Sequence, residues 1–99
     1  MLEKNYTPKR TVCKVTFSVP EDWANEEVKL VGDFNGWDTE ADKLKKKKGH
    51  WEITKRLKPK SEYHFRYFID GQTWKNDDEA DHYVSNDFGS ENSVIITGE

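Results

Sequence analysis

Trp37 is the residue whose type and position most plainly suggest contact with a ligand. It ends the segment 28–37 (VKLVGDFNGW), in which side chains alternate as in a half-buried strand before a turn at Asn35-Gly36. An Asn-Gly pair readily adopts the positive φ angles of a tight turn, so we expect the indole at an edge of the fold. There it could stack on a flat apolar ligand surface. The alternative is that Trp37 caps the end of the core, since Trp is often mostly buried.

A second candidate group lies on the strand predicted at residues 62–70 (EYHFRYFID). Its odd positions are apolar and form one face, which places Arg66 and Phe68 together on the outward face. A cation beside an aromatic ring on an open sheet face can be the floor of a polar ligand site. It can also be plain surface packing, in which Arg66 pairs with a carboxylate of the same surface.

Two further aromatic rings are candidates for the surface. Phe88 lies between Asp87 and Gly89, a setting that favours an exposed ring over a core position. Trp23 is a further exposed-ring candidate, which either extends a docking surface or covers the bottom of the core.

The remaining polar residues do not indicate catalysis or metal binding. Two carboxylates can suffice for a glycosidase, but a small β domain offers no deep cleft to raise the pKa of one of them. No Ser, His and Asp set or Cys and His set stands out. The histidines lack the spacing of metal ligands, and the acidic stretch 76–81 lacks the glycine of a calcium-binding loop. We therefore expect no enzyme activity, no cofactor and no metal.

Length and composition restrict the chain to a single small domain. Its 99 residues allow one core. The 16 Lys and Arg against 19 Asp and Glu, a net charge of −3, do not demand a nucleic acid partner. Cys13 is the single cysteine and can form no internal disulfide, which fits a reducing compartment. Since no apolar run could span a bilayer or serve as a signal segment, we expect a soluble, cytoplasmic protein with no membrane partner.

Alternation and turn residues predict the fold that must position these candidates. Strands are expected at residues 11–19, 28–33, 51–57, 62–70 and 92–97, with Trp51 in the core. The lysine-rich segment 44–47 adds an edge strand or is a solvated turn, and segment 76–87 is expected to connect two sheets. The pattern predicts an all-β sandwich of about seven short antiparallel strands at residues 11–97, preceded by an N-terminal tail at 1–10.

Three motifs occur in order along the chain: GDFNGW at 32–37, YHFRYFIDG at 63–71 and FGSENSVI at 88–95. Together they resemble carbohydrate-binding module family 48, which includes isoamylase N-terminal-like domains and the glycogen-binding domain of the AMP-activated protein kinase beta subunit. The similarity spans about 11–97, nearly the whole chain. It implies an immunoglobulin-like, early-set β-sandwich that binds an α-glucan, such as glycogen, starch or a maltooligosaccharide, without catalysis and without a cofactor.

The resemblance also assigns sugar contacts to individual positions. The family's first sugar-stacking Trp falls on Trp37, and its strand Lys, which hydrogen-bonds sugar hydroxyls, falls on Arg66. The second platform Trp of the family lies directly after the DG turn, whereas Trp74 here is offset by one residue, which leaves open the face that its ring takes. The family's late apolar residue, hydroxyl and Asn fall on Phe88, Ser90 and Asn92. The resemblance implies that Asn92, which can donate and accept, contacts sugar hydroxyls; the alternative is that it satisfies backbone groups of its own turn.

The alternative function is a structural or protein-docking module in which sugar binding has been lost. Its partner would be a glycan-processing enzyme of the amylase type, a kinase-like protein or another copy of this chain. The two functions differ at Trp37 and Trp74, because rings on one open face with Arg66 favour sugar binding, whereas rings turned inward or spread over a flat apolar patch favour docking. For sugar binding we expect a Kd of roughly micromolar to millimolar.

Overall fold

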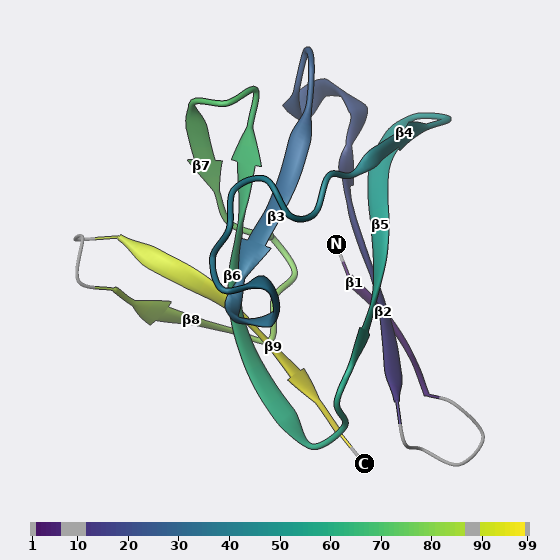
Figure 1. Ribbon diagram of the computed structural model, residues 1–99, viewed down its shortest axis with the longest axis vertical. Helices are drawn as coiled ribbons and strands as arrows, with labels where there is room; N and C mark the ends of the chain where they lie inside the picture. Colours follow the sequence, from purple (N-terminus) through teal and green to yellow (C-terminus); the bar gives the residue numbers. More distant parts are fainter. Residues whose placement is uncertain (1, 7–11, 87–89, 99) are drawn as a thin grey trace.

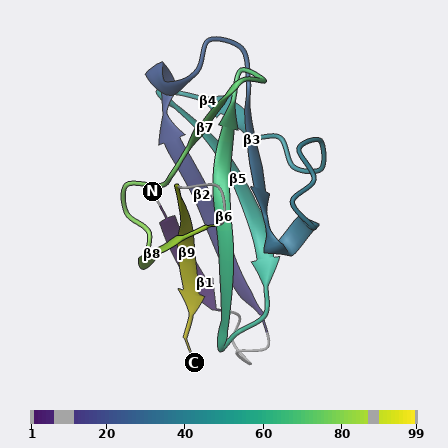
Figure 2. The same cartoon turned by 90° about the vertical axis from the view of Figure 1, so that its left-hand side faces the viewer.

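The computed structural model describes residues 2–6, 12–86 and 90–98, which form two β-sheets packed face to face (Figures 1 and 2). The described strands are β1 Leu2–Tyr6, β2 Cys13–Pro20, β3 Val28–Gly32, β4 Lys45–Lys47, β5 His50–Leu57, β6 Ser61–Ile69, β7 Thr73–Lys75, β8 His82–Ser85 and β9 Glu91–Thr97. Short 3-10 helices, η1 Glu21–Trp23 and η2 Asp33–Asn35, precede and follow β3. In this part of the chain, no helix has the length and apolar character needed to cross a bilayer.

The sheets have the orders β1-β2-β5-β4 and β3-β6-β9-β8, with β7 also paired to β6. Every pairing between these strands is antiparallel. The predicted all-β, immunoglobulin-like sandwich is therefore confirmed, with more strands in the described residues than the seven or so that the sequence indicated. The lysine-rich strand β4 is an edge strand, as one of the sequence alternatives proposed.

The core between the sheets is built from alternate residues of facing strands. On β2, and on the second half of β6, every second side chain is buried, and Trp51 of β5 is buried as predicted. Phe65 packs edge to face on Phe17 of the opposite sheet and on Tyr67, with ring centroids 5.1 and 5.8 Å apart. A few large rings thus join the two sheets.

The N-terminal segment is not the tail that the sequence predicts, because Leu2–Tyr6 forms β1 along the edge of β2. The ammonium group of Lys4 crosses to the other sheet, where it donates to the carboxylate of Asp81 (2.7 Å) and to the carbonyl oxygen of Ile96 (2.8 Å). These partners are distant in the sequence, so local residue patterns could not indicate them. The segment of β1 is also short and mostly polar, and it was not predicted as a strand.

Segment 76–87 does not connect the two sheets as predicted, because its described part contains β8, which pairs with β9 in the same sheet. All four residues of β8 are exposed, so the sequence shows no alternation there. The loop before β8 is held by Asp77, whose buried carboxylate accepts a hydrogen bond from Tyr67 Oη (2.6 Å) and whose N–H donates to Ser93 Oγ (2.9 Å). Two bonds to neighbouring strands thus fix the path from β7 to β8.

Strand β3 is buried on both faces, whereas its alternation predicts a half-buried strand. Segment 42–44 covers its free edge, through backbone hydrogen bonds of 2.9 Å donated by Leu30 and Leu44. Lys29 is only 9% exposed, and its ammonium group is paired with the carboxylate of Glu40 at 2.9 Å. A paired charge of this kind can be accommodated in a mostly buried strand.

The start of the β6–β7 connection depends on Asp70, which has a positive φ of 50°. Its carboxylate accepts hydrogen bonds from the backbone N–H groups of Asn25, Glu26 and Glu27 at 2.9, 2.7 and 2.9 Å. Hydrogen bonds to the ionised form favour that form, so they lower the pKa of Asp70 below its usual value of 3.8. One carboxylate thereby joins the loop before β3 to the end of β6.

The lowered pKa predicts an acid-sensitive contribution to stability. Ionised Asp70 stabilises the fold above about pH 4, and this contribution is lost as the pH falls through the lower, folded-state pKa. We expect Asp70→Asn to unfold at a lower urea concentration at pH 7 and to lose less stability than the wild type between about pH 4 and pH 2. Urea titrations at several pH values, followed by Trp fluorescence, measure both, with the exposed Asp22→Asn as control. Identical pH profiles for Asp70→Asn and wild type would contradict this assignment.

Candidate functional site

The turn after β3 holds Trp37 at the surface. The positive φ angles occur at Gly36 (68°) and Trp37 (60°), rather than at the Asn35-Gly36 pair that the sequence indicated. The Trp37 N–H donates to the carbonyl oxygen of Gly32 (2.9 Å), and the indole Nε1–H donates to Asp33 Oδ1 (2.9 Å). The side chain is 37% exposed, so Trp37 does not cap the core.

Asn35 contributes its side chain to this turn instead of an unusual backbone angle. Its Oδ1 accepts from the Gly32 N–H (3.1 Å), and its Nδ2 donates to the Leu30 carbonyl oxygen (2.9 Å) and to Asp42 Oδ2 (2.7 Å). The amide therefore connects η2, β3 and the segment that covers the edge of β3. The position of Trp37 depends on this connection.

Trp74 lies on the same face of the sheet as Arg66, so its one-residue offset does not turn the ring to the opposite face. Strand β7 pairs with β6 so that Trp74 is opposite Phe68, and the two ring centroids are 4.5 Å apart. The guanidinium carbon of Arg66 is 5.7 Å from the centroid of the Trp74 ring. The indole is 39% exposed, so it offers a ring surface to solvent while it rests on Phe68.

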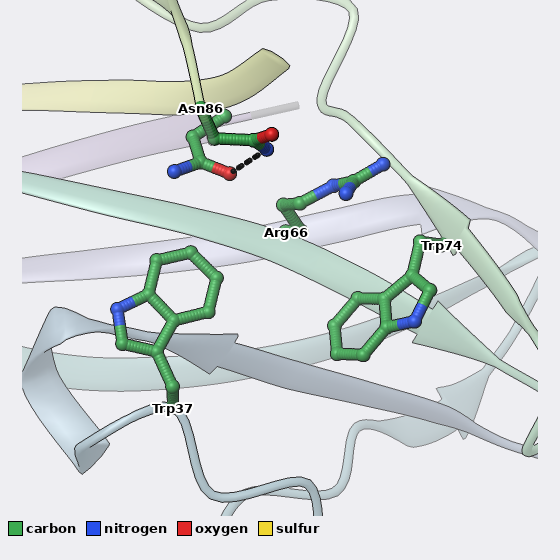
Figure 3. A pocket seen from close by; sticks show the side chains of 5 residues that line it. Trp37, Arg66, Trp74 and Asn86 are labelled. Atoms are coloured by element: carbon green, nitrogen blue, oxygen red, sulfur yellow. Dashed lines mark hydrogen bonds between the residues drawn. The ribbon is translucent and has the colours of Figure 1, made fainter. Parts of the chain in front are cut away.

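Trp37, Arg66 and Trp74 line one cleft of about 560 Å³, together with Asn86 and Asn92. Figure 3 shows the two indole rings on either side of Arg66, with Asn86 on the far side of β6 from Trp37. None of these lining residues is a carboxylate, histidine or cysteine, which could transfer a proton or act as a nucleophile. The arrangement is suited to binding.

A polar network runs along the upper edge of the cleft. Arg66 Nη1 donates to Ser90 Oγ (3.2 Å), and Asn86 Nδ2 donates to Ser90 Oγ (3.2 Å) and to Asn92 Oδ1 (3.1 Å). The Asn86 N–H donates to the Ser90 carbonyl oxygen (2.9 Å) and thereby closes the connection between β8 and β9. Of the predicted contacts, Arg66, Ser90 and Asn92 are thus brought together, while Phe88 lies outside the described residues.

Asn86 is a lining residue that the sequence did not indicate. It falls in a segment without alternation, and its importance follows only from the pairing of β8 with β9. The alternative for Arg66, an ion pair on the sheet surface, is not observed, because no carboxylate of the described chain lies within ion-pair distance of it. Arg66 Nε is also buried without a hydrogen-bond partner in this part of the chain.

Trp23 lies apart from the cleft and covers the core. Its ring meets Tyr67 edge to face with centroids 6.0 Å apart, and Lys75 Nζ lies 4.4 Å from its centroid. Of the two alternatives for Trp23, packing against the core is therefore observed. No group of three or more His, Cys, Asp or Glu in the described residues is placed to hold a metal ion.

An open cleft with two exposed indole rings, a cation and amide groups, on the outer face of a small β-sandwich, has the form of a carbohydrate-binding module. The model of one protein family, described as the glycogen recognition site of AMP-activated protein kinase, matches residues 15–99. The chain belongs to this family, as its motifs indicated. Membership supports carbohydrate binding in general, and modules of this kind are typically non-catalytic. A search of curated proteins gave no match.

The hydrogen bonds of Asn35 lead to a prediction about stability. Asn35→Ala leaves the Gly32 N–H and the Leu30 carbonyl without their side-chain partner, so we expect the free energy of unfolding to fall by about 1–3 kcal/mol. Urea unfolding measures the change, and Asn5→Ala, an amide exposed on β1, is the matched control. Equal midpoints for Asn35→Ala and wild type would show that this amide does not hold the turn.

Proposed function

We propose that this protein binds α-glucans, such as glycogen, starch or maltooligosaccharides, without catalysis through the cleft between Trp37 and Trp74. The observation that carries the proposal is the placement of both rings and Arg66 on one open face of the sandwich. Family membership gives independent support for a carbohydrate ligand. That the carbohydrate is an α-glucan, and that these residues contact it, is our proposal.

The chemistry of the cleft matches that of a glucan. Each sugar has apolar C–H faces and a rim of hydroxyl groups, so a receptor needs flat rings for the faces and hydrogen-bonding groups for the rims. Trp37 comes from the turn after β3 and Trp74 from strand β7, and each can hold one sugar of a curved, α-linked chain. The volume of about 560 Å³ lies within the usual range of about 300–1,000 Å³ for small-ligand sites.

The rings should supply most of the affinity, because a solvent-exposed hydrogen bond contributes only about 0.5–1.5 kcal/mol net. Arg66, Asn92 and Asn86 would set the orientation of the sugar at the upper edge. Ser90 would act with them, and Phe88 is proposed as a further contact, although it lies outside the described residues. Protein docking is the weaker alternative, because neither ring of the cleft is turned into the core.

The proposal predicts saturable binding of maltoheptaose and β-cyclodextrin with a Kd of roughly micromolar to millimolar. Isothermal titration calorimetry gives the affinity, and backbone amide shifts locate the site. Trp37→Ala and Trp74→Ala each remove an apolar surface worth about 1.5 kcal/mol or more, so we expect affinity to fall about tenfold or more in each.

Trp23→Phe is the matched control, because it changes a Trp outside the cleft and keeps a ring against Tyr67. It should bind like the wild type. Binding that persists unchanged in both cleft variants would place the glucan elsewhere. The absence of any shift at about ten millimolar sugar would reject the proposed function and favour a protein partner.

A further inference from the structure

The hydrogen bonds beside Arg66 determine which atoms of Ser90 and Asn92 are left for a ligand. The backbone N–H of Ser90 donates to Asn86 Oδ1 (3.3 Å), and this bond defines the orientation of the Asn86 amide. A backbone N–H can only donate, so the atom that it meets must be the amide oxygen of Asn86. The other terminal atom of Asn86 is therefore its NH₂ group, a donor.

The polarity of the neighbouring side chains follows from this orientation. Asn86 Nδ2 donates to Asn92 Oδ1, so Asn92 has its NH₂ group left to present to a ligand. Ser90 Oγ accepts from both Asn86 Nδ2 and Arg66 Nη1, and neither of these nitrogen atoms can accept in return. The hydroxyl hydrogen of Ser90 is therefore available for donation to a third group.

Arg66 adds a positive charge to this set of donors. A guanidinium group has no acceptor atom, and no carboxylate of the described residues lies within ion-pair distance of it. The carboxylate of Asp33, which is bonded to Trp37, already accepts from the Trp37 indole (2.9 Å) and from the His64 backbone N–H (2.7 Å). Within the described residues, the upper edge of the cleft thus presents donors and a cation that has no carboxylate at ion-pair distance.

We propose that this edge is a donor-rich subsite, oriented by Asn86, which favours an α-glucan carrying an anionic ester group such as phosphate over the unsubstituted chain. A sugar hydroxyl accepts one hydrogen bond here, but for its own hydrogen the side chains of this edge offer only amide oxygens that already accept from another donor. A phosphate ester offers acceptor oxygens and a negative charge, and its bonds to Arg66 are charge-assisted. The inference rests on the proposed function, because the two rings must hold the glucan chain.

The test compares maltoheptaose with a maltoheptaose that carries a single 6-phosphate ester, at low ionic strength. We expect the ester to bind about three- to tenfold more tightly and the difference to shrink as salt is added. Glucose 6-phosphate and inorganic phosphate are titrated in parallel and should bind more weakly than the phosphorylated chain. Inorganic phosphate that bound as tightly as the ester would overturn the proposal, because the site would then be one for free anions.

Two substitutions assign the preference to the subsite. Arg66→Gln removes the charge and should abolish the preference for the ester, measured as the ratio of the two dissociation constants within this variant. Asn86→Asp is nearly isosteric but replaces a donor by an acceptor, so it should draw Ser90 and Asn92 toward itself and reverse the preference. Ser85→Asp places the same charge on exposed β8 outside this network and is the control, which should keep the preference.

The outcomes separate this inference from the function on which it rests. If maltoheptaose binds at the cleft and the ester binds equally or less tightly, the subsite proposal is wrong and the proposed function stands. If neither ligand binds, both fail. A preference that survives in Arg66→Gln would also overturn the subsite proposal. Amide spectra of each variant show whether it has kept the native fold.

Discussion

Strand β6 uses both of its faces, and the rest of the structure depends on its two-residue alternation. Its inward side chains, Phe65 and Tyr67, join the two sheets, while its outward side chains, Arg66 and Phe68, lie beneath the cleft. A shift of one residue in the pairing would move the guanidinium group into the core and a core ring into solvent. The packing of the core therefore fixes the register of the site on the opposite face.

The strands that pair with β6 deliver the other parts of the cleft. Trp37 follows β3, Trp74 belongs to β7, and Asn92 belongs to β9. The approach of β3 to β6 is close at Gly32, where a Cβ atom would lie 2.5 Å from the carbonyl oxygen of His64. Any side chain here would push the two strands apart, just where the turn to Trp37 begins. The glycine of the first motif thus has a packing role.

The sequence predicted what depends on local alternation and on the order of motifs. The inward face of β6, the core position of Trp51 and the joint placement of Trp37, Arg66 and Asn92 were of this kind. It did not predict β1 and β8, because β1 has only two apolar residues, on either side of Lys4, and all four residues of β8 are exposed. The position of Asn86 was missed for a related reason, since its bonds depend on a hairpin formed by such a strand.

The cross-sheet bonds of Lys4 show that the folded domain begins before the residues that match the family model. The family match begins at residue 15, inside β2, whereas β1 pairs with β2 and Lys4 bonds to Asp81, just before β8, and to Ile96 of β9. A fragment cut at that boundary would begin within a strand and leave one edge of β2 with unpaired N–H and C=O groups. Such an edge can pair with a second chain, so self-association of the fragment would be a consequence of where it was cut.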